Sequence, residues 1–135
     1  MKMQIAAVAL AALAATAPVS ASAKKLTGEE QLAKVLEGRV AGKPTDCVPP
    51  RPSAHLYVID KTALIYDTGR TIYVNYTADP EVLDDDDILV VRDPMPSLCR
   101  TTQITTRDRT GGFFTGPIFL TDFIPYTLPD KDKKD

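Results

Sequence analysis

Residues 55–77, HLYVIDKTALIYDTGRTIYVNYT, decide the fold of this chain. They contain three short runs rich in isoleucine, valine and tyrosine, and turn-forming residues separate these runs, which is typical of β-strands. The Asp67–Arg70 segment predicts a hairpin turn because Gly69 adopts positive φ without steric cost. In the third run, Ile72 and Val74 fall on one face because side chains alternate along a strand. We therefore predict an antiparallel meander with the strands His55–Asp60, Ala63–Asp67 and Arg70–Thr77.

Shorter β-rich runs continue after the meander. The Ile88–Val91 run is apolar at every position, which predicts burial on both faces. Gly111-Gly112 and Gly116-Pro117 bracket Phe113 and Phe114, and we expect this loop to direct both phenylalanines into the core. A spacing of about 8 to 15 residues between runs favours an antiparallel meander or a small, partly open barrel. The predicted downstream strands are Asp87–Arg92, Thr101–Arg107 and Pro117–Leu120.

One amphipathic helix precedes the strands, at Leu26–Gly38. Thr27 is a favourable N-cap, and Glu30 three residues later completes a capping box. Gly38 stands where a helix commonly ends in the left-handed conformation. The proline-rich segment Val40–Ser53 is predicted to be a connector, because proline disfavours both a helix and a central strand. The predicted fold class is α+β: mainly β, with one N-terminal helix packed on one side of a small antiparallel meander or partly open barrel.

The first 23 residues have the features of a cleaved secretory signal. Lys2 supplies a positive start, Ile5–Ala17 is an apolar run, and Ala21-Ser22-Ala23 matches the small-x-small pattern that signal peptidase cleaves. Cleavage after this motif places the mature start at Lys24, with Ser22 as a neighbouring alternative. We expect a periplasmic or secreted protein made of a signal peptide (1–23), a single β-rich domain with the N-terminal helix (24–129) and a charged disordered tail (130–135).

The charge balance excludes two classes of partner. The chain carries 16 basic and 18 acidic residues, for a net charge of −2, whereas a nucleic-acid-binding protein presents a basic face. It also lacks a lysine–arginine cluster dense enough for an anionic lipid surface. The apolar N-terminal run is about 13 residues long, shorter than the roughly 20 that span a bilayer. We therefore expect no nucleic-acid partner and no membrane span, but a monomer that binds an unknown envelope protein or a small ligand.

Cys47 and Cys99 are the only cysteines in the chain. In an oxidising compartment, two cysteines in one small domain predict a disulfide. Closing the loop between them would stabilise the domain by about 4 kcal/mol in the chain-entropy model. A redox-active pair is an alternative, but the C-x-x-C spacing that supports such a role is absent. A pair of free thiols is the third interpretation.

Four short motifs follow one another between Leu36 and Tyr126. They are Gly38-Arg39-x-x-Gly42-Lys43-Pro44-x-x-Cys47, Ile65-Tyr66-Asp67-Thr68-Gly69, Leu98-Cys99-Arg100 and Phe123-Ile124-Pro125-Tyr126. In this order they resemble an uncharacterised family of short secreted proteobacterial proteins, classified as a domain of unknown function. The resemblance implies a fold and an exported location but no activity. Family members often carry two further cysteines, which this chain lacks, so the resemblance also implies that Cys47 and Cys99 pair with each other.

The sequence contains no complete catalytic constellation. His55 is the only histidine, and a hydrolase would need a nucleophile and an orienting acid beside it. Ser53 and Asp60 are the nearest such residues. The acidic run Asp84–Asp87 is predicted to be a solvated turn, with weak divalent-cation binding as the alternative. We therefore predict no catalytic, metal-binding or cofactor-binding residues.

Basic side chains are scattered along the strands. They would line an anion-binding face only if the sheet brought them together, and local ion pairs are the default interpretation. These residues are Lys61, Arg70, Arg92, Arg100, Arg107 and Arg109.

These features predict a non-enzymatic binding or structural module of the cell envelope. The alternative is an inhibitor or accessory subunit of an envelope enzyme, which would present the preorganised Pro49–Pro52 loop with Arg51 as a basic finger. A hydrolase built around His55 is a third interpretation. Tyrosine suits half-exposed contact surfaces, and Tyr57 is one of several in the meander. The predicted partner contacts are Arg51 and Tyr57.

Overall fold

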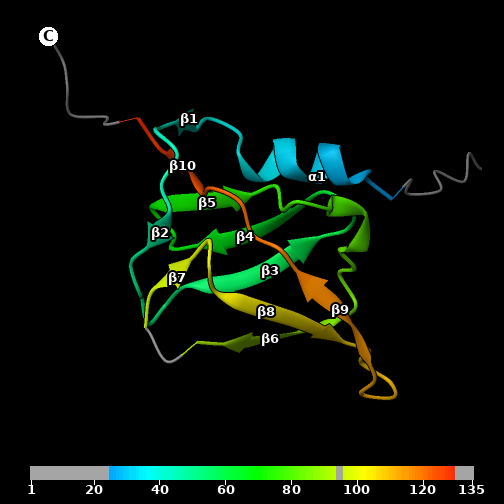
Figure 1. Ribbon diagram of the computed structural model, residues 1–135. Coiled ribbons are helices and arrows are strands. Elements are labelled where there is room, and N and C mark those ends of the chain that lie inside the picture. The colour runs from blue at the N-terminus through cyan, green and yellow to red at the C-terminus, as the bar shows by residue number, and fades with distance from the viewer. Residues whose placement is uncertain (1–24, 94–95, 130–135) are drawn as a thin grey trace, which may run out of the picture.

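The protein consists of three stacked layers (Figure 1). The computed structural model describes residues 25–93 and 96–129, and the predicted signal peptide and charged tail lie outside them. One helix covers one face of a five-stranded antiparallel sheet, and a three-stranded antiparallel sheet packs on the other face. The predicted α+β class is confirmed, with open sheets rather than a closed barrel in the described residues. The elements are α1 Gly28–Val35, β1 Val40–Ala41, β2 Cys47–Val48, β3 His55–Ile59, β4 Ala63–Asp67, β5 Thr71–Asn75, the 3₁₀-helix η1 Pro80–Val82, β6 Ile88–Arg92, β7 Leu98–Cys99, β8 Gln103–Arg107, β9 Phe114–Ile118 and β10 Ile124–Thr127.

The predicted three-strand meander is confirmed. β3 pairs with β4 and β4 pairs with β5, both antiparallel, within a sheet ordered β1-β10-β5-β4-β3. Gly69 in the turn has a φ of 88°, and its N–H donates a hydrogen bond of 2.7 Å to the Asp67 carboxylate. Ile65 lies opposite both Tyr57 and Val74. Apolar residues from the three strands therefore form one continuous row on the helix-facing side of the sheet.

The N-terminal helix has the predicted N-cap but is shorter than predicted at both ends. The Thr27 hydroxyl accepts a hydrogen bond from the Glu30 N–H at 3.2 Å, and the Glu30 carboxylate accepts one from the Thr27 N–H at 2.9 Å, which completes the capping box. The helix ends at Val35 because Leu36 leaves the helical conformation, and Gly38 then adopts the expected positive φ of 73°. Among the described residues, no helix has the length and hydropathy that a membrane crossing requires.

Both faces of the five-stranded sheet are buried. The helix-facing core consists of Leu32, Ile59, Ala63, Ile65, Ile72 and Val74. The core between the two sheets consists of Val48, Leu64, Leu83, Leu98, Ile104, Ile118, Leu120 and Phe123. Burial of apolar side chains is the main favourable term in folding, so the five-stranded sheet is fixed from both sides. The three-stranded sheet, ordered β6-β8-β9, contributes only its inner face to a core.

The prediction that the Ile88–Val91 run is buried on both faces is wrong. β6 pairs with β8 alone and forms an edge of the three-stranded sheet. Ile88 and Val91 are 42% and 44% exposed. No described layer covers the outer face of this sheet, which leaves Ile88 exposed. Val91 lies opposite buried Ile104 on the inner face, and its exposure follows from the position of its strand at the sheet edge.

The proline-rich connector contains two short strands that the sequence did not predict. β1 pairs with the last two residues of β10, and β2 pairs with β7. Each has only two residues, which fits the restriction that nearby prolines place on sheet pairing.

Strands β2 and β7 bring the two cysteines together. Cys47 lies directly opposite Cys99, and their sulfur atoms are bonded at 2.07 Å. The predicted disulfide is therefore confirmed, and it ties the proline-rich segment to the chain that leads into β8. Because disulfides persist where thiols are not kept reduced, this bond indicates an oxidising compartment.

Two tyrosine phenols should make stability depend on alkaline pH. Burial, and then a hydrogen bond with Tyr126, raise the pKa of Tyr76 to about 12. Burial, and then the negative charge of Asp67, raise the pKa of Tyr57 above its ordinary value. The folded state therefore holds these protons more tightly than the unfolded chain, so their stabilising contribution is complete below about pH 10 and is lost as the pH rises toward about 12. Urea midpoints should fall between about pH 9 and about pH 11.5, and the fall should be smaller in Tyr76→Phe. An equal fall in both proteins would contradict this assignment.

Candidate binding site

Three of the four phenylalanines are exposed beside the outer face of the three-stranded sheet. Phe113, Phe114 and Phe119 are 74%, 60% and 65% exposed, whereas Phe123 is fully buried; these are the four phenylalanines of the sequence. The three exposed rings lie on β9 or immediately beside its ends. Phe113 and Phe114 lie at one end of β9 and Phe119 at the other, about 16 Å away along the strand, and large exposed apolar side chains along one element mark a candidate interaction surface. This face is therefore the first candidate for a binding surface.

The prediction that Phe113 and Phe114 enter the core is wrong. Phe114 lies opposite Arg107 of β8, and a register shift next to this pair marks a β-bulge, which re-aims side chains. At the neighbouring inward position, the partner of buried Thr106 is Gly116. The Thr106 hydroxyl donates a hydrogen bond of 3.2 Å to the Gly116 carbonyl. The Thr115 hydroxyl donates a hydrogen bond of 2.7 Å to the Thr106 hydroxyl, so a threonine rather than a phenylalanine lies beside this buried position.

The loop that carries the first two exposed rings is rigidly built. The Gly112 N–H donates a hydrogen bond of 2.9 Å to the Asp108 carbonyl, and the Asp108 N–H donates one of 2.8 Å to the Phe113 carbonyl. The Arg107 guanidinium donates a hydrogen bond of 3.1 Å to the Gly112 carbonyl. Gly112 has a φ of 70°, a left-handed conformation that favours glycine. A preordered loop loses little entropy when a partner binds.

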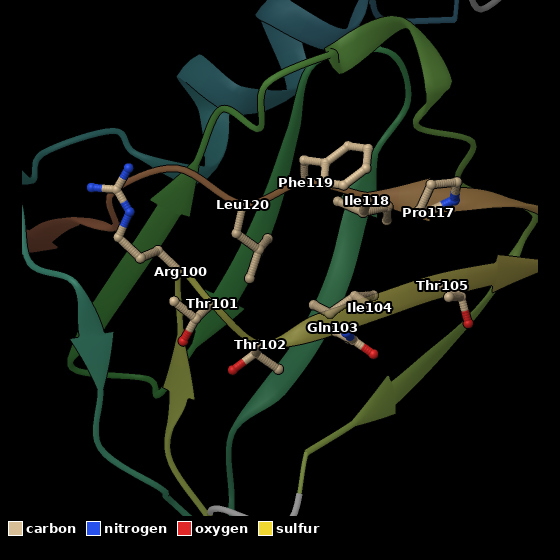
Figure 2. Close-up of a pocket in the computed structure, with 10 residues that line it drawn as sticks. All are labelled: Arg100, Thr101, Thr102, Gln103, Ile104, Thr105, Pro117, Ile118, Phe119 and Leu120. Atoms are coloured by element: carbon tan, nitrogen blue, oxygen red, sulfur yellow. The ribbon is translucent and has the colours of Figure 1, made fainter.

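A cavity opens where β8 and β9 stop pairing. Their last paired residues at this end are Ile104 and Ile118, and the chains then diverge around a space of about 460 Å³. Figure 2 shows Leu120 directed into this space, with Thr101 and Thr102 across from it. The volume falls within the roughly 300 to 1,000 Å³ that is typical of ligand pockets.

The cavity combines an apolar floor with a polar rim. Ile104, Ile118 and Leu120 are buried beneath it. Thr101 and Gln103 are exposed at its edge, and their side chains form no hydrogen bond within residues 25–93 and 96–129. An apolar floor supplies affinity, and a few polar rim groups fix the orientation of what binds.

Asn75 holds one wall of the cavity in place. Its amide nitrogen donates a hydrogen bond of 2.8 Å to the Thr121 carbonyl, and its amide oxygen accepts one of 3.0 Å from the Thr121 N–H. The Ala78 N–H donates a further bond of 2.8 Å to the Phe119 carbonyl. These bonds tie the Phe119–Thr121 segment to the end of β5, so this segment diverges from β8. The sequence did not predict these bonds, although a polar residue at an inward position of an apolar strand was the available signal.

Arg100 fixes the opposite wall. Its guanidinium lies 2.7 Å from the Asp122 carboxylate and 3.8 Å from the Asp46 carboxylate. The backbone N–H of Arg100 donates a hydrogen bond of 2.8 Å to the Asp46 carbonyl. This residue therefore forms ion pairs, as the default interpretation expected. However, its partners come from distant segments rather than from neighbours in the sequence.

The two predicted contact residues lie in different places. Tyr57 packs against the helix-facing core. Arg51 is exposed, and its N–H donates a hydrogen bond of 3.2 Å to the hydroxyl of Tyr66, a residue that packs against the core between the sheets. The structure does not bring Arg51 and Tyr57 onto one surface, and each remains a separate predicted contact.

The three residues of the hydrolase interpretation do not converge. His55 and Asp60 stand at opposite ends of β3, and five strand positions correspond to about 16 Å. In the register, His55 lies opposite Asp67 instead. An acid this far away does not orient the imidazole of His55 for base catalysis.

The acidic run forms an exposed turn, as expected. The Asp84 carboxylate accepts a hydrogen bond of 2.9 Å from the Asp86 N–H. The structure adds Asp60 to this region: Asp60, Asp84 and Asp85 each place a carboxylate oxygen within 4.8 Å of the others. Oxygen ligands of this kind suit Ca²⁺ or Mg²⁺, but clusters of exposed carboxylates are also common without a bound ion.

Comparison of the chain with protein-family models, with curated proteins and with solved structures found no match.

Proposed function

We propose that this protein is a non-catalytic binding module of the bacterial cell envelope. Its partner would bind the outer face of the three-stranded sheet, with one apolar group seated in the cavity between β8 and β9. In this proposal, the signal segment 1–23 is cleaved and the domain acts in the periplasm or outside the cell. The Cys47–Cys99 disulfide supports an oxidising compartment of this kind.

A single observation carries the proposal: three of the four phenylalanines are exposed to solvent, and all three lie on β9 or immediately beside its ends. Keeping large apolar side chains in water forgoes the stabilisation that their burial gives, about 1.5 to 3 kcal/mol for a full side chain. Binding a partner recovers this contribution. Aromatic anchors seated near a pocket are also the usual energetic centres of protein interfaces.

A photo-crosslinking experiment tests this surface directly. Benzoylphenylalanine placed at Phe114 or Phe119 should crosslink the exported protein to a discrete partner in its host, whereas the same probe at Val40 should not. Val40 is a matched control because it is also highly exposed, at 59%, but lies on the five-stranded sheet.

Alanine variants supply the energetic test. The double variant Phe114→Ala/Phe119→Ala should retain the captured partner at least about tenfold less well, as expected for hot-spot residues. Its melting temperature should stay close to that of the parent protein, because surface substitutions usually change stability by no more than about 0.5 kcal/mol. His55→Ala should leave capture unchanged. Loss of function in His55→Ala alone would instead support the hydrolase interpretation.

A further inference from the structure

A second, smaller cavity lies beside the β4–β5 turn. It encloses about 200 Å³ and is lined by Arg51, Ser53, Thr68, Arg70, Thr71 and Tyr73. Every lining residue has a polar side chain, two carry guanidinium groups and none is acidic. The cavity shares no lining residue with the one between β8 and β9. It is therefore a separate and electropositive site.

Three of the lining side chains are uncommitted hydrogen-bond donors. The Arg51 guanidinium, the Ser53 hydroxyl and the Tyr73 hydroxyl make no hydrogen bond or ion pair with any residue that the structure describes. A guanidinium has five N–H donors and no acceptor, and each hydroxyl adds one more donor. Donors that line one cavity, with no carboxylate among the lining residues, suit a ligand that is rich in acceptor atoms.

The backbone that carries Arg51 and Ser53 is held in place before any ligand arrives. The Tyr66 hydroxyl accepts a hydrogen bond of 3.2 Å from the Arg51 N–H and donates one of 3.2 Å to the Pro49 carbonyl. The Ala54 N–H donates a bond of 3.0 Å to the Arg51 carbonyl, which fixes the other side of this segment. The ordered backbone loses little conformational entropy when an anion binds, so the cost of ordering falls mainly on the Arg51 side chain.

The turn on the other side of the cavity is fixed as well. The Arg39 guanidinium donates hydrogen bonds of 3.0 Å to the Gly69 carbonyl and 2.9 Å to the Arg70 carbonyl. The Thr68 hydroxyl closes the turn by donating to the Thr71 carbonyl at 2.7 Å. Arg39 also brings a third positive charge to this end of the molecule.

We propose that this cavity binds a phosphate group, with Arg51 as the main charged donor and the hydroxyls of Ser53 and Tyr73 as further donors. Arginine recognises phosphate by paired, charge-assisted hydrogen bonds. The number of donors favours the several acceptor oxygens of phosphate over the two of a carboxylate. A volume of about 200 Å³ is below the roughly 300 Å³ at which whole-ligand pockets begin. The cavity therefore takes the charged group of a ligand, whose remainder would extend into solvent.

Nuclear magnetic resonance of the purified ¹⁵N-labelled protein tests the site. The probes are inorganic phosphate, glycerol 3-phosphate and acetate, each titrated at constant ionic strength with sodium chloride as the compensating salt. Phosphate should cause saturable shifts at the Arg51 side chain and at the Ser53 and Thr71 amides. Equal affinity for glycerol 3-phosphate would show that a phosphomonoester is accepted, and tighter binding of it would show that the ligand extends beyond the cavity. Acetate should bind about tenfold more weakly.

Two variants and one matched control make the assignment specific. Arg51→Gln should weaken phosphate binding by about tenfold or more, and Tyr73→Phe should weaken it by about threefold. Arg109→Gln should have no effect, because the Arg109 guanidinium donates to the Asp86 carbonyl at a different site. The proposal is overturned if phosphate causes no saturable shift at these residues. It is also overturned if Arg51→Gln binds as tightly as the parent protein, or if acetate binds as tightly as phosphate.

Discussion

Replacing both Cys47 and Cys99 by alanine should lower the free energy of unfolding by about 4 kcal/mol. The disulfide closes a loop with a sequence separation of 52, and removing it restores the entropy of that loop to the unfolded chain. Typical domains have a net stability of about 5–15 kcal/mol, so the variant should be only marginally folded. Urea unfolding monitored by tyrosine fluorescence and circular dichroism measures this change.

The disulfide should also affect the cavity between β8 and β9, because Cys99 lies next to Arg100, which lines that cavity. The Cys99 N–H donates a hydrogen bond of 2.9 Å to the Thr102 hydroxyl, and Arg100 is bonded to the segment that carries Cys47 through Asp46. Hydrogen exchange at Thr101 and Thr102 should therefore accelerate when the bond is removed. Reducing the unmodified protein with dithiothreitol is the control that changes no side chain. A loss of less than about 1 kcal/mol in both experiments would show that the loop-closure argument fails here.

The features that the sequence predicted correctly depend on local patterns. The turn at Gly69, the capping box at Thr27 and the alternation of Ile72 and Val74 each involve residues that are close in sequence. Their conformations follow from sterics and neighbouring hydrogen bonds. The disulfide was predictable for a different reason, since a chain with two cysteines in an oxidising compartment has only one intramolecular pairing.

The binding face was not predictable because it depends on contacts between distant segments. Phe113 and Phe114 are residue types typical of a core, and the bulge between β8 and β9, which a single sequence does not reveal, places Phe114 opposite Arg107 instead. The exposure of Ile88 likewise depends on its strand lying at an edge of the sheet, which a single sequence does not specify. Arg51 was singled out as a basic finger on a proline-rich loop, and the structure places it in a polar cavity with Arg70, 19 positions further along the chain.

Asn75 illustrates how such long-range contacts shape the site, and its replacement should have the second largest effect on stability. The side chain is completely buried. Its amide oxygen accepts hydrogen bonds from the Thr77 N–H, the Thr121 N–H and the Thr121 hydroxyl, and its nitrogen donates to the Thr121 carbonyl. Asn75→Ala would leave these groups without their partner inside the protein. Each unsatisfied buried polar group costs about 1 to 3 kcal/mol, and partial access to water limits the total to about 3 kcal/mol.

Thr121→Val is the matched control for Asn75→Ala. It removes only the hydroxyl that lies 3.2 Å from the Asn75 oxygen and keeps the backbone bonds, so it should cost about 1 kcal/mol. Hydrogen exchange should separate the two variants further. In Asn75→Ala, the Thr121 N–H and the Ala78 N–H should both lose protection, because the segment that forms the cavity wall is no longer tied to β5. In Thr121→Val, both should remain protected. If the two variants lost equal stability and equal protection, the backbone alone would hold the wall, and the proposed role of Asn75 in shaping the cavity would be wrong.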